Sequence, residues 1–142
     1  MTEDITAAGA VGGRARRHRA QGAKADQLHT LLCSLDPVLG EWADGFIFGE
    51  VWARPGLSQD ERMLVAITAL AASGHPDQMR NYLWGALQAG IPARKVHEAL
   101  LMLVVYVGFP RALNALHVWR TVFEAARTSG TAVDLDDARA DA

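Results

Sequence analysis

The sequence predicts an all-α protein, a compact multi-helix domain that assembles into homo-oligomers. Alanine and leucine favour helices and occur 25 and 16 times in 142 residues, whereas tyrosine occurs twice. No segment alternates apolar and polar residues with the period of two that a half-buried strand shows. Proline, glycine and capping residues instead divide the chain into segments of helical length.

Both ends of the chain predict poorly ordered segments. Residues 1–25 have almost no large apolar side chains but carry five basic ones, Arg14, Arg16, Arg17, Arg19 and Lys24. This composition predicts a basic, partly disordered arm. The alternative is an arm that folds over a neighbouring subunit or brings an arginine to an anionic ligand. Residues 128–142 are acidic and low in bulk, which predicts a flexible tail.

The residues between these ends, 26–127, are expected to form the helical domain. Helices are expected from Asp36-Pro37 to about Trp52, from Ser58 to about Ser73, from Pro76 to about Gly90, from Pro92 to Val107, and from Pro110 to about Arg127. Ser58 and Glu61 have the spacing of a capping box. Pro76 suits the first turn of its helix, and Gly90 suits the residue after the last turn. The segment 63–72 is apolar nearly all round, which predicts a central, buried helix.

Composition excludes several classes of protein. A net charge of −2 argues against a general nucleic-acid binder. Cys33 is the single cysteine, which excludes a disulfide scaffold and a Cys-x-x-Cys redox centre, and no spacing of His, Asp or Glu predicts a metal site. The longest apolar run, residues 99–110, is shorter than the roughly 20 residues of a membrane span. Without a signal-peptide pattern, we expect a cytoplasmic protein with no membrane partner.

Two predicted helices are apolar on nearly every side, around residues 63–72 and 99–107. A domain of this size has too little other surface to cover both of them. The excess apolar surface predicts that copies of the chain associate.

Two groups of residues resemble the carboxymuconolactone decarboxylase family. The first is the segment FGEVWARPGL at 48–57, followed by an apolar helix and GALQAG at 85–90. The second is YVGFP at 106–110, with His117 seven residues after Pro110. The resemblance extends over roughly residues 16–126. It implies an alkylhydroperoxidase-like helical fold, a trimer or hexamer, no cofactor, and a small-molecule site between helices near the subunit contacts.

This sequence departs from both branches of that family where the helix from Pro76 begins. The redox branch carries Cys-x-x-Cys-x-x-x-His there, and this chain has neither cysteine, so thiol peroxidase activity is not expected. The decarboxylase branch carries Glu-x-Arg-x-His, whereas this chain has Gln78, Arg80 and Tyr82. An amide thus replaces the carboxylate, and a phenol replaces the imidazole.

Four residues are candidates for catalysis. Gln78 and Tyr82 are four residues apart and share a helix face, with His75 near the start of the same stripe. Tyr82 is predicted to donate a proton or stabilise an oxyanion, and Gln78 to orient a carbonyl group. His117 or His75 would be the group that exchanges a proton near neutral pH. The structural alternatives are that Tyr82 and His117 pack in the core and that His75 is an exposed residue at a helix start.

Other residues are candidates for substrate binding. Arg54, with Arg80 or Arg17, is predicted to hold the carboxylates of an anionic substrate. Glu50 is predicted to be an ionised partner of an arginine. Aromatic side chains predicted to line the pocket are Trp52, Trp84 and Tyr106. As alternatives, Arg54 is a surface charge and the aromatic residues pack in the core or an interface. His97 lies on a mostly polar stretch and is predicted to be a surface residue.

These residues together predict an enzyme that acts on a small cyclic or lactone-like carboxylated metabolite. The expected reaction is decarboxylation or a related step that forms an enolate, without a cofactor. The alternative is a non-catalytic or repurposed homologue that binds an apolar small molecule or serves as an assembly partner.

Overall fold

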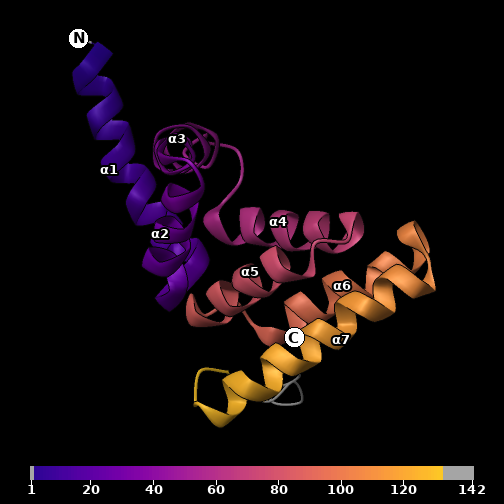
Figure 1. Cartoon of the computed structure of the whole chain (residues 1–142). Helices are drawn as coiled ribbons and strands as arrows, with labels where there is room; N and C mark the ends of the chain where they lie inside the picture. Colours follow the sequence, from indigo (N-terminus) through magenta and orange to yellow (C-terminus); the bar gives the residue numbers. More distant parts are fainter. Residues whose placement is uncertain (1, 133–142) are drawn as a thin grey trace. The chain divides into compact units, whose positions relative to one another are not determined.

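Helices make up nearly all of the chain that the structure describes. The computed structural model describes residues 2–132, with side chains from residue 9 onward, and contains no strand in that range. The prediction of an all-α fold is confirmed. In chain order the elements are α1 (Thr2–Gln21), the 3-10 turn η1 (Gly22–Lys24), α2 (Ala25–Leu35), α3 (Pro37–Glu41), the π-helix η2 (Trp42–Val51), α4 (Gln59–Ser73), α5 (Pro76–Gln88), α6 (Ala93–Val107) and α7 (Phe109–Thr128) (Figure 1).

These elements form two compact units, Met1–Arg62 and Met63–Ala142. The boundary falls inside α4, and therefore inside the range 26–127 for which one helical domain was predicted. Most of the predicted acidic tail, residues 133–142, lies outside the described residues. No helix among residues 2–132 is long and apolar enough to cross a membrane.

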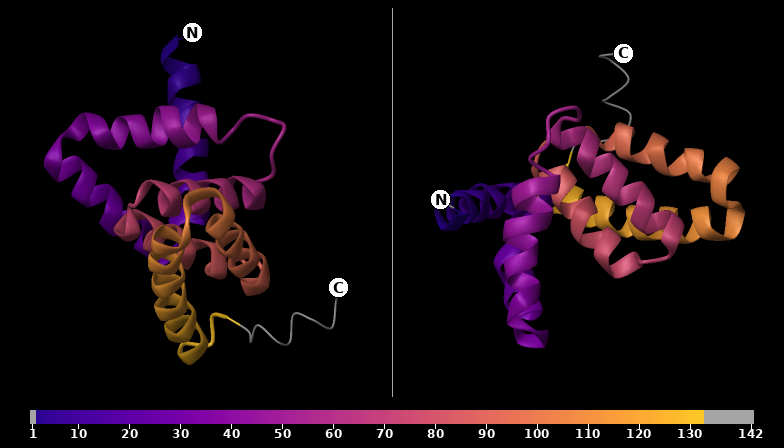
Figure 2. Two further views of the ribbon diagram at one scale, coloured as in Figure 1. Left: turned by 90° about the vertical axis from the view of Figure 1, so that its right-hand side faces the viewer. Right: turned by 90° about the horizontal axis from the view of Figure 1, so that it is seen from above.

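In the first unit, helix α1 replaces the predicted arm. It crosses η2 (Figure 2), and glycine residues allow the two backbones to approach closely there. A Cβ atom on Gly13 would overlap the backbone carbonyl of Asp44, and one on Gly49 would come within 2.9 Å of the Gly9 carbonyl oxygen. The arm was predicted because bulky apolar residues are few here. Helices rich in glycine pack through close backbone approach instead, which such a count does not detect.

The helix predicted to start at Asp36-Pro37 does start there, but it changes type along its length. Asp36 Oδ1 accepts a hydrogen bond from the Val38 amide at 2.9 Å, which caps α3. From Trp42 onward the chain is π-helical, and the Trp52 amide donates to the Ile47 carbonyl, five residues back, at 2.9 Å. The sequence pattern did not indicate this change to a π-helix, a type of helix that is frequent at functional sites.

Local end signals predicted the remaining helices well. The capping box is formed, since the Glu61 amide donates to Ser58 Oγ at 3.1 Å and the Ser58 amide donates to Glu61 Oε2 at 2.7 Å. Pro76 occupies the first turn of α5, and Gly90 follows its end with a φ of 85°. Gly108, also at φ 85°, separates α6 from α7.

The second unit contains α5, α6, α7 and all but the first turn of α4. Helices α6 and α7 run antiparallel on either side of Gly108, and α5 packs on α7 (Figure 2). The large side chains in the core of this unit include Met63, Ile67, Met79, Leu83, Val96, Leu100, Trp119, Val122 and Phe123.

The prediction that α4 is buried all round is wrong. It buries one stripe with a spacing of four, Met63, Ile67 and Ala71, whereas Val65 is 56% exposed. The apolar end of α6 is similar, because Val105 and Tyr106 are 81% and 74% exposed. Periodicity showed that these segments are apolar, but the single chain does not cover every side of them.

The contact between α1 and η2 gives a direct test of the first unit. Gly13→Ala is expected to destabilise the protein by about 1–3 kcal/mol or more, because the new methyl group meets backbone that cannot rotate away. Gly9→Ala on the same helix is the matched control, since no atom lies within 4 Å of its added Cβ. Thermal unfolding of the two variants checks this. Equal melting temperatures would contradict the close contact.

Candidate active site

A pocket of about 350 Å³ lies in the second unit where α4 ends and α5 begins. It is lined by Leu70, Ala71, Gly74, His75, Pro76, Met79, Arg111, Asn114 and Ala115. The volume is at the lower end of the range for small-molecule sites. Helices α4 and α5 and the turn between them provide one side of the pocket, and the first turns of α7 provide the other.

Arg111 is held at the edge of this pocket by the backbone of α4. Its Nη1 donates to the Ala72 carbonyl oxygen at 3.2 Å. Gly74 makes room for the guanidinium group, since a Cβ atom there would overlap Arg111 Nη1. The φ of Gly74 is 77°, a conformation that other residues rarely adopt. A single turn therefore both ends α4 and positions a cation.

His75 is placed by the same turn. Its Nδ1 lies 2.8 Å from Ser73 Oγ, and that hydroxyl group donates its proton to the Leu70 carbonyl at 3.3 Å. The contact orients the ring, and which of the two atoms donates depends on the imidazole tautomer. An imidazole in this arrangement can exchange a proton with a bound molecule.

The pocket thus combines three polar functions with an apolar floor. The guanidinium group of Arg111 can bind a carboxylate, the amide of Asn114 can donate to an oxygen that gains negative charge, and His75 can deliver a proton. Ala71 and Met79 provide apolar surface beside them. This set can bind a small anion and stabilise a change of charge within it.

His75, the N-cap of α5, is a predicted catalytic residue that lines this pocket. Gln78 and Tyr82, the predicted catalytic residues within α5, are not among its lining residues. Met79 and Leu83 are buried and define the inward face of the helix. Gln78 is exposed, and Tyr82 and Trp84 are partly buried. Arg80 is partly buried, and its Nη1 lies 3.5 Å from Asp77 Oδ1 on the same helix.

A second pocket of the same unit, about 530 Å³, contains His117. It lies between α6 and α7 and is lined by His97, Leu113, Leu116, His117, Trp119, Arg120 and Phe123. Trp119 Nε1 donates to His97 Nδ1 at 3.1 Å, and Arg120 Nη2 lies 3.2 Å from His117 Nδ1. His97 is therefore not the surface residue that its position suggested, because it is partly buried and bonded to a core tryptophan.

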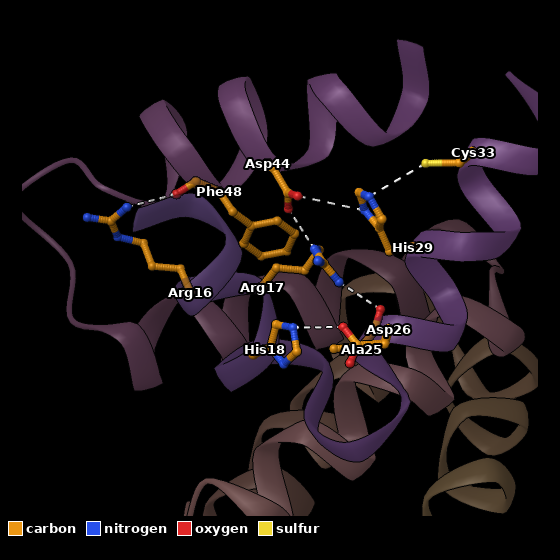
Figure 3. A network of polar contacts seen from close by, with 9 residues as sticks. All are labelled: Arg16, Arg17, His18, Ala25, Asp26, His29, Cys33, Asp44 and Phe48. Atoms are coloured by element: carbon orange, nitrogen blue, oxygen red, sulfur yellow. Dashed lines mark hydrogen bonds and ion pairs between the residues drawn. The ribbon is translucent and has the colours of Figure 1, made fainter. Parts of the chain in front are cut away.

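Arg17, predicted to bind substrate, has structural partners in the first unit instead. It is 2% exposed, its Nε lies 2.7 Å from Asp44 Oδ1, and its Nη1 donates to the Ala25 carbonyl at 2.7 Å (Figure 3). The buried Asp44 carboxylate neutralises its charge. The guanidinium group thus joins α1 to η2 and to the start of α2.

The other predicted binding residues have varied surroundings. In the first unit, Glu50 and Arg54 are exposed, and Trp52 is partly buried with its ring 5.0 Å from that of Phe48. In the second unit, Tyr106 is 74% exposed rather than packed. No group of three His, Cys, Asp or Glu side chains in the described part of the chain could hold a metal ion.

Residues 37–121, which are more than half of the chain, match the carboxymuconolactone decarboxylase family. The chain belongs to this family. The resemblance inferred from the segments at 48–57, 85–90 and 106–110 is confirmed.

Two relatives have named activities. A 4-carboxymuconolactone decarboxylase of Acinetobacter baylyi is 37% identical over 79 residues, which are 56% of this chain and 59% of that protein. A nitrosuccinic acid decarboxylase of Metarhizium robertsii is 30% identical over 81 residues, which are 57% of this chain and 54% of that protein. The chain therefore matches little more than half the length of either relative.

Two residues of the 350 Å³ pocket, Arg111 and Asn114, were not predicted from the sequence. A signal for Arg111 was present, because it directly follows the family segment at 106–110. Only the fold showed that α7 brings these two side chains to His75, which is 36 and 39 positions earlier in the chain.

The role of Arg17 can be tested by removing its charge. Arg17→Met is expected to lower the free energy of unfolding by about 3–5 kcal/mol, because it leaves the Asp44 carboxylate buried without its cation. Urea denaturation measures this change. Arg14→Met, an exposed arginine of the same helix, is the matched control. Unchanged stability in Arg17→Met would contradict the structural role and support the role in substrate binding.

Proposed function

We propose that this chain is a decarboxylase of small carboxylic acids that carry a second, electron-accepting group. The observation that supports it best is the pocket at the start of α5, where His75, Arg111 and Asn114 surround an apolar floor. Family membership and two relatives named as decarboxylases support the same class of reaction.

The chemistry explains why this set of side chains is suitable. When a carboxylate leaves as CO2, the bonding electron pair stays on carbon and must spread onto a nearby oxygen. The compounds in the relatives' names, carboxymuconolactone and nitrosuccinic acid, carry a lactone and a nitro group, which accept such a pair. Both compounds also keep a second carboxylate after the loss of CO2. We propose a substrate of this class for the present chain.

Each polar side chain of the pocket has a distinct role in this proposal. Arg111 binds the carboxylate that is retained. The Asn114 amide donates to the oxygen that becomes negative as the bond to CO2 breaks. His75, protonated on both nitrogens, then delivers the proton from Nε2 to carbon. One carboxylate and one proton are consumed, and CO2 and a new C–H bond are formed.

Tyr82 and Gln78 remain the competing predictions for the proton donor and the group that orients the carbonyl. They lie on α5 next to the proposed site, and Tyr82 is partly buried. The proposal for His75 differs in placing the proton carrier at the start of the helix. Substitutions separate the two assignments.

CO2 release from γ-carboxymuconolactone and from nitrosuccinate tests the proposal. His75→Gln is expected to lower kcat by about 10²- to 10⁴-fold, the usual loss when a general acid is removed. Arg111→Met is expected to lower kcat/KM by about 10- to 100-fold, through loss of a charge-assisted hydrogen bond. Tyr82→Phe is expected to retain most of the activity.

Matched substitutions in the second pocket, His117→Gln and Arg120→Met, serve as the comparison. A collapse of activity there would move the reaction to the second pocket. A collapse in Tyr82→Phe with little effect of His75→Gln would assign the proton to the phenol. No turnover of either compound by the native protein would overturn this substrate class.

A second candidate function is binding of an apolar small molecule without chemistry. The observation that favours it is the second pocket, whose walls include Leu113, Leu116 and Phe123. Trp119 lines this pocket and reports its occupancy by fluorescence. Saturable quenching by an aromatic acid such as benzoate, without CO2 release, would favour this function over the first.

We also propose that the chain forms a homo-oligomer, a trimer or hexamer, as predicted from sequence. Large apolar side chains around the junction of α6 and α7 support this, since Met102, Val105, Tyr106, Phe109 and Leu113 are each more than half exposed. Light scattering after size-exclusion chromatography is expected to give three or six times the 15.3 kDa chain mass. Val105→Glu is expected to yield smaller species. A native monomer would contradict the proposal.

A further inference from the structure

The first unit contains a group of polar side chains that the proposed reaction does not use. It consists of Cys33 and His29 of α2 and Asp44 of η2, and Figure 3 shows the three side chains in a row. We propose that they form a reactive-thiol site in which Cys33 is covalently modified by small carbon electrophiles that carry a carboxylate.

The cysteine and the histidine are paired through their spacing. They are four residues apart on α2, which puts them on the same face of the helix. Cys33 Sγ lies 3.5 Å from His29 Nε2. A thiolate is the nucleophilic form of cysteine, and an imidazole at this distance can accept the thiol proton.

Asp44 is the third residue of this group. Cys33 is the nucleophile, His29 is the base, and Asp44 orients the base. Its Oδ2 lies 3.8 Å from His29 Nδ1, a buried nitrogen with no hydrogen-bond partner among the described residues. Asp44 cannot easily turn away, because its Oδ1 is held at 2.7 Å by the buried Arg17. Such contacts are often loose in a free enzyme and shorten when a ligand binds. A negative charge beside Nδ1 favours the imidazolium that forms as His29 takes the thiol proton.

The surroundings of this group form a pocket rather than a packed core. The pocket has a volume of about 570 Å³ and is lined by Ala10, Arg14, His29, Cys33, Pro37, Gly40, Glu41, Asp44 and Gly45. Gly40 makes the space, because a Cβ atom there would overlap Cys33 Sγ and come within 2.9 Å of the His29 ring. Cys33 itself is partly exposed.

The charges of the pocket indicate which electrophiles it takes. Asp44 faces Arg17 through Oδ1 and His29 through Oδ2, and Glu41 and Arg14 are the other charged groups of the lining. Arg14 is exposed, lines the pocket and can bind a carboxylate. A small electrophile with a carboxylate is thereby directed to Cys33, whereas a neutral one gains nothing from Arg14.

The covalent step needs no further reagent. Cys33 Sγ forms a bond to the electrophilic carbon, the leaving group departs from that carbon with its bonding pair, and the thiol proton passes to His29 Nε2.

Alkylation rates of the full chain test this inference. Iodoacetate carries a carboxylate and iodoacetamide does not, and mass spectrometry locates the adduct on Cys33. At pH 6.5 the folded chain is expected to react with iodoacetate at least about 10-fold faster than the chain unfolded in urea. The preference for iodoacetate over iodoacetamide is expected to exceed that of glutathione.

Three variants separate a reactive site from a chance contact. His29→Gln is expected to lower the rate at pH 6.5 about 10-fold and to give a rate that rises with pH as for an ordinary thiol. Arg14→Gln is expected to slow iodoacetate but not iodoacetamide. His18→Gln is the matched control, because His18 also faces a carboxylate, Asp26 at 2.9 Å, but no cysteine.

The proposal is overturned if folded Cys33 reacts no faster than the unfolded chain, or if His29→Gln leaves the pH profile unchanged. If His29→Gln fails to fold, Arg14→Gln decides the matter. If Arg14→Gln slows iodoacetate and iodoacetamide equally, or slows neither, the site does not select electrophiles that carry a carboxylate. Circular dichroism of each variant confirms folding. These outcomes do not depend on CO2 release and leave the proposed decarboxylase function to its own test.

Discussion

The first unit depends on the buried ion pair between Arg17 and Asp44. Its two charges lie 27 residues apart in sequence, and removing either would leave the other buried and unpaired. Arg17 also holds the Ala25 carbonyl, so one side chain joins α1, α2 and η2. The same interaction fixes the Asp44 carboxylate beside His29. A contact that stabilises the fold thereby also positions a polar side chain next to a pocket.

Glycine serves a common purpose at three places in this chain. Gly13 lets α1 approach the backbone of η2, Gly40 makes room for Cys33 and His29, and Gly74 makes room for the guanidinium group of Arg111. In each case a methyl group would occupy the space of a backbone or polar atom. Only Gly74 among these three also needs a positive φ. In both units, polar side chains therefore occupy their positions partly because a neighbouring glycine has no side chain there.

Family membership and the altered helix start are compatible in physical terms. The family pattern at the beginning of α5 places an acid and an imidazole on one helix face, and this chain has Gln78 and Tyr82 there instead. The structure has an imidazole nearby at the helix cap, His75, which Ser73 contacts and which lines a pocket together with Arg111. An imidazole and a guanidinium group thus line one pocket, although they come from other positions of the chain.

Sequence alone determined the helical class, the family and the ends of α4 to α7. These follow from local signals, such as the box of Ser58 and Glu61 or the glycines at 90 and 108, whose energies depend on residues a few positions apart. Tertiary structure decided the burial of Arg17, the one-sided packing of α4 and the exposure of Tyr106. It also decided the meeting of Arg111 with the backbone of Ala72, 39 residues away. Periodicity shows which face of a helix is apolar, but which surface covers that face depends on how distant segments pack.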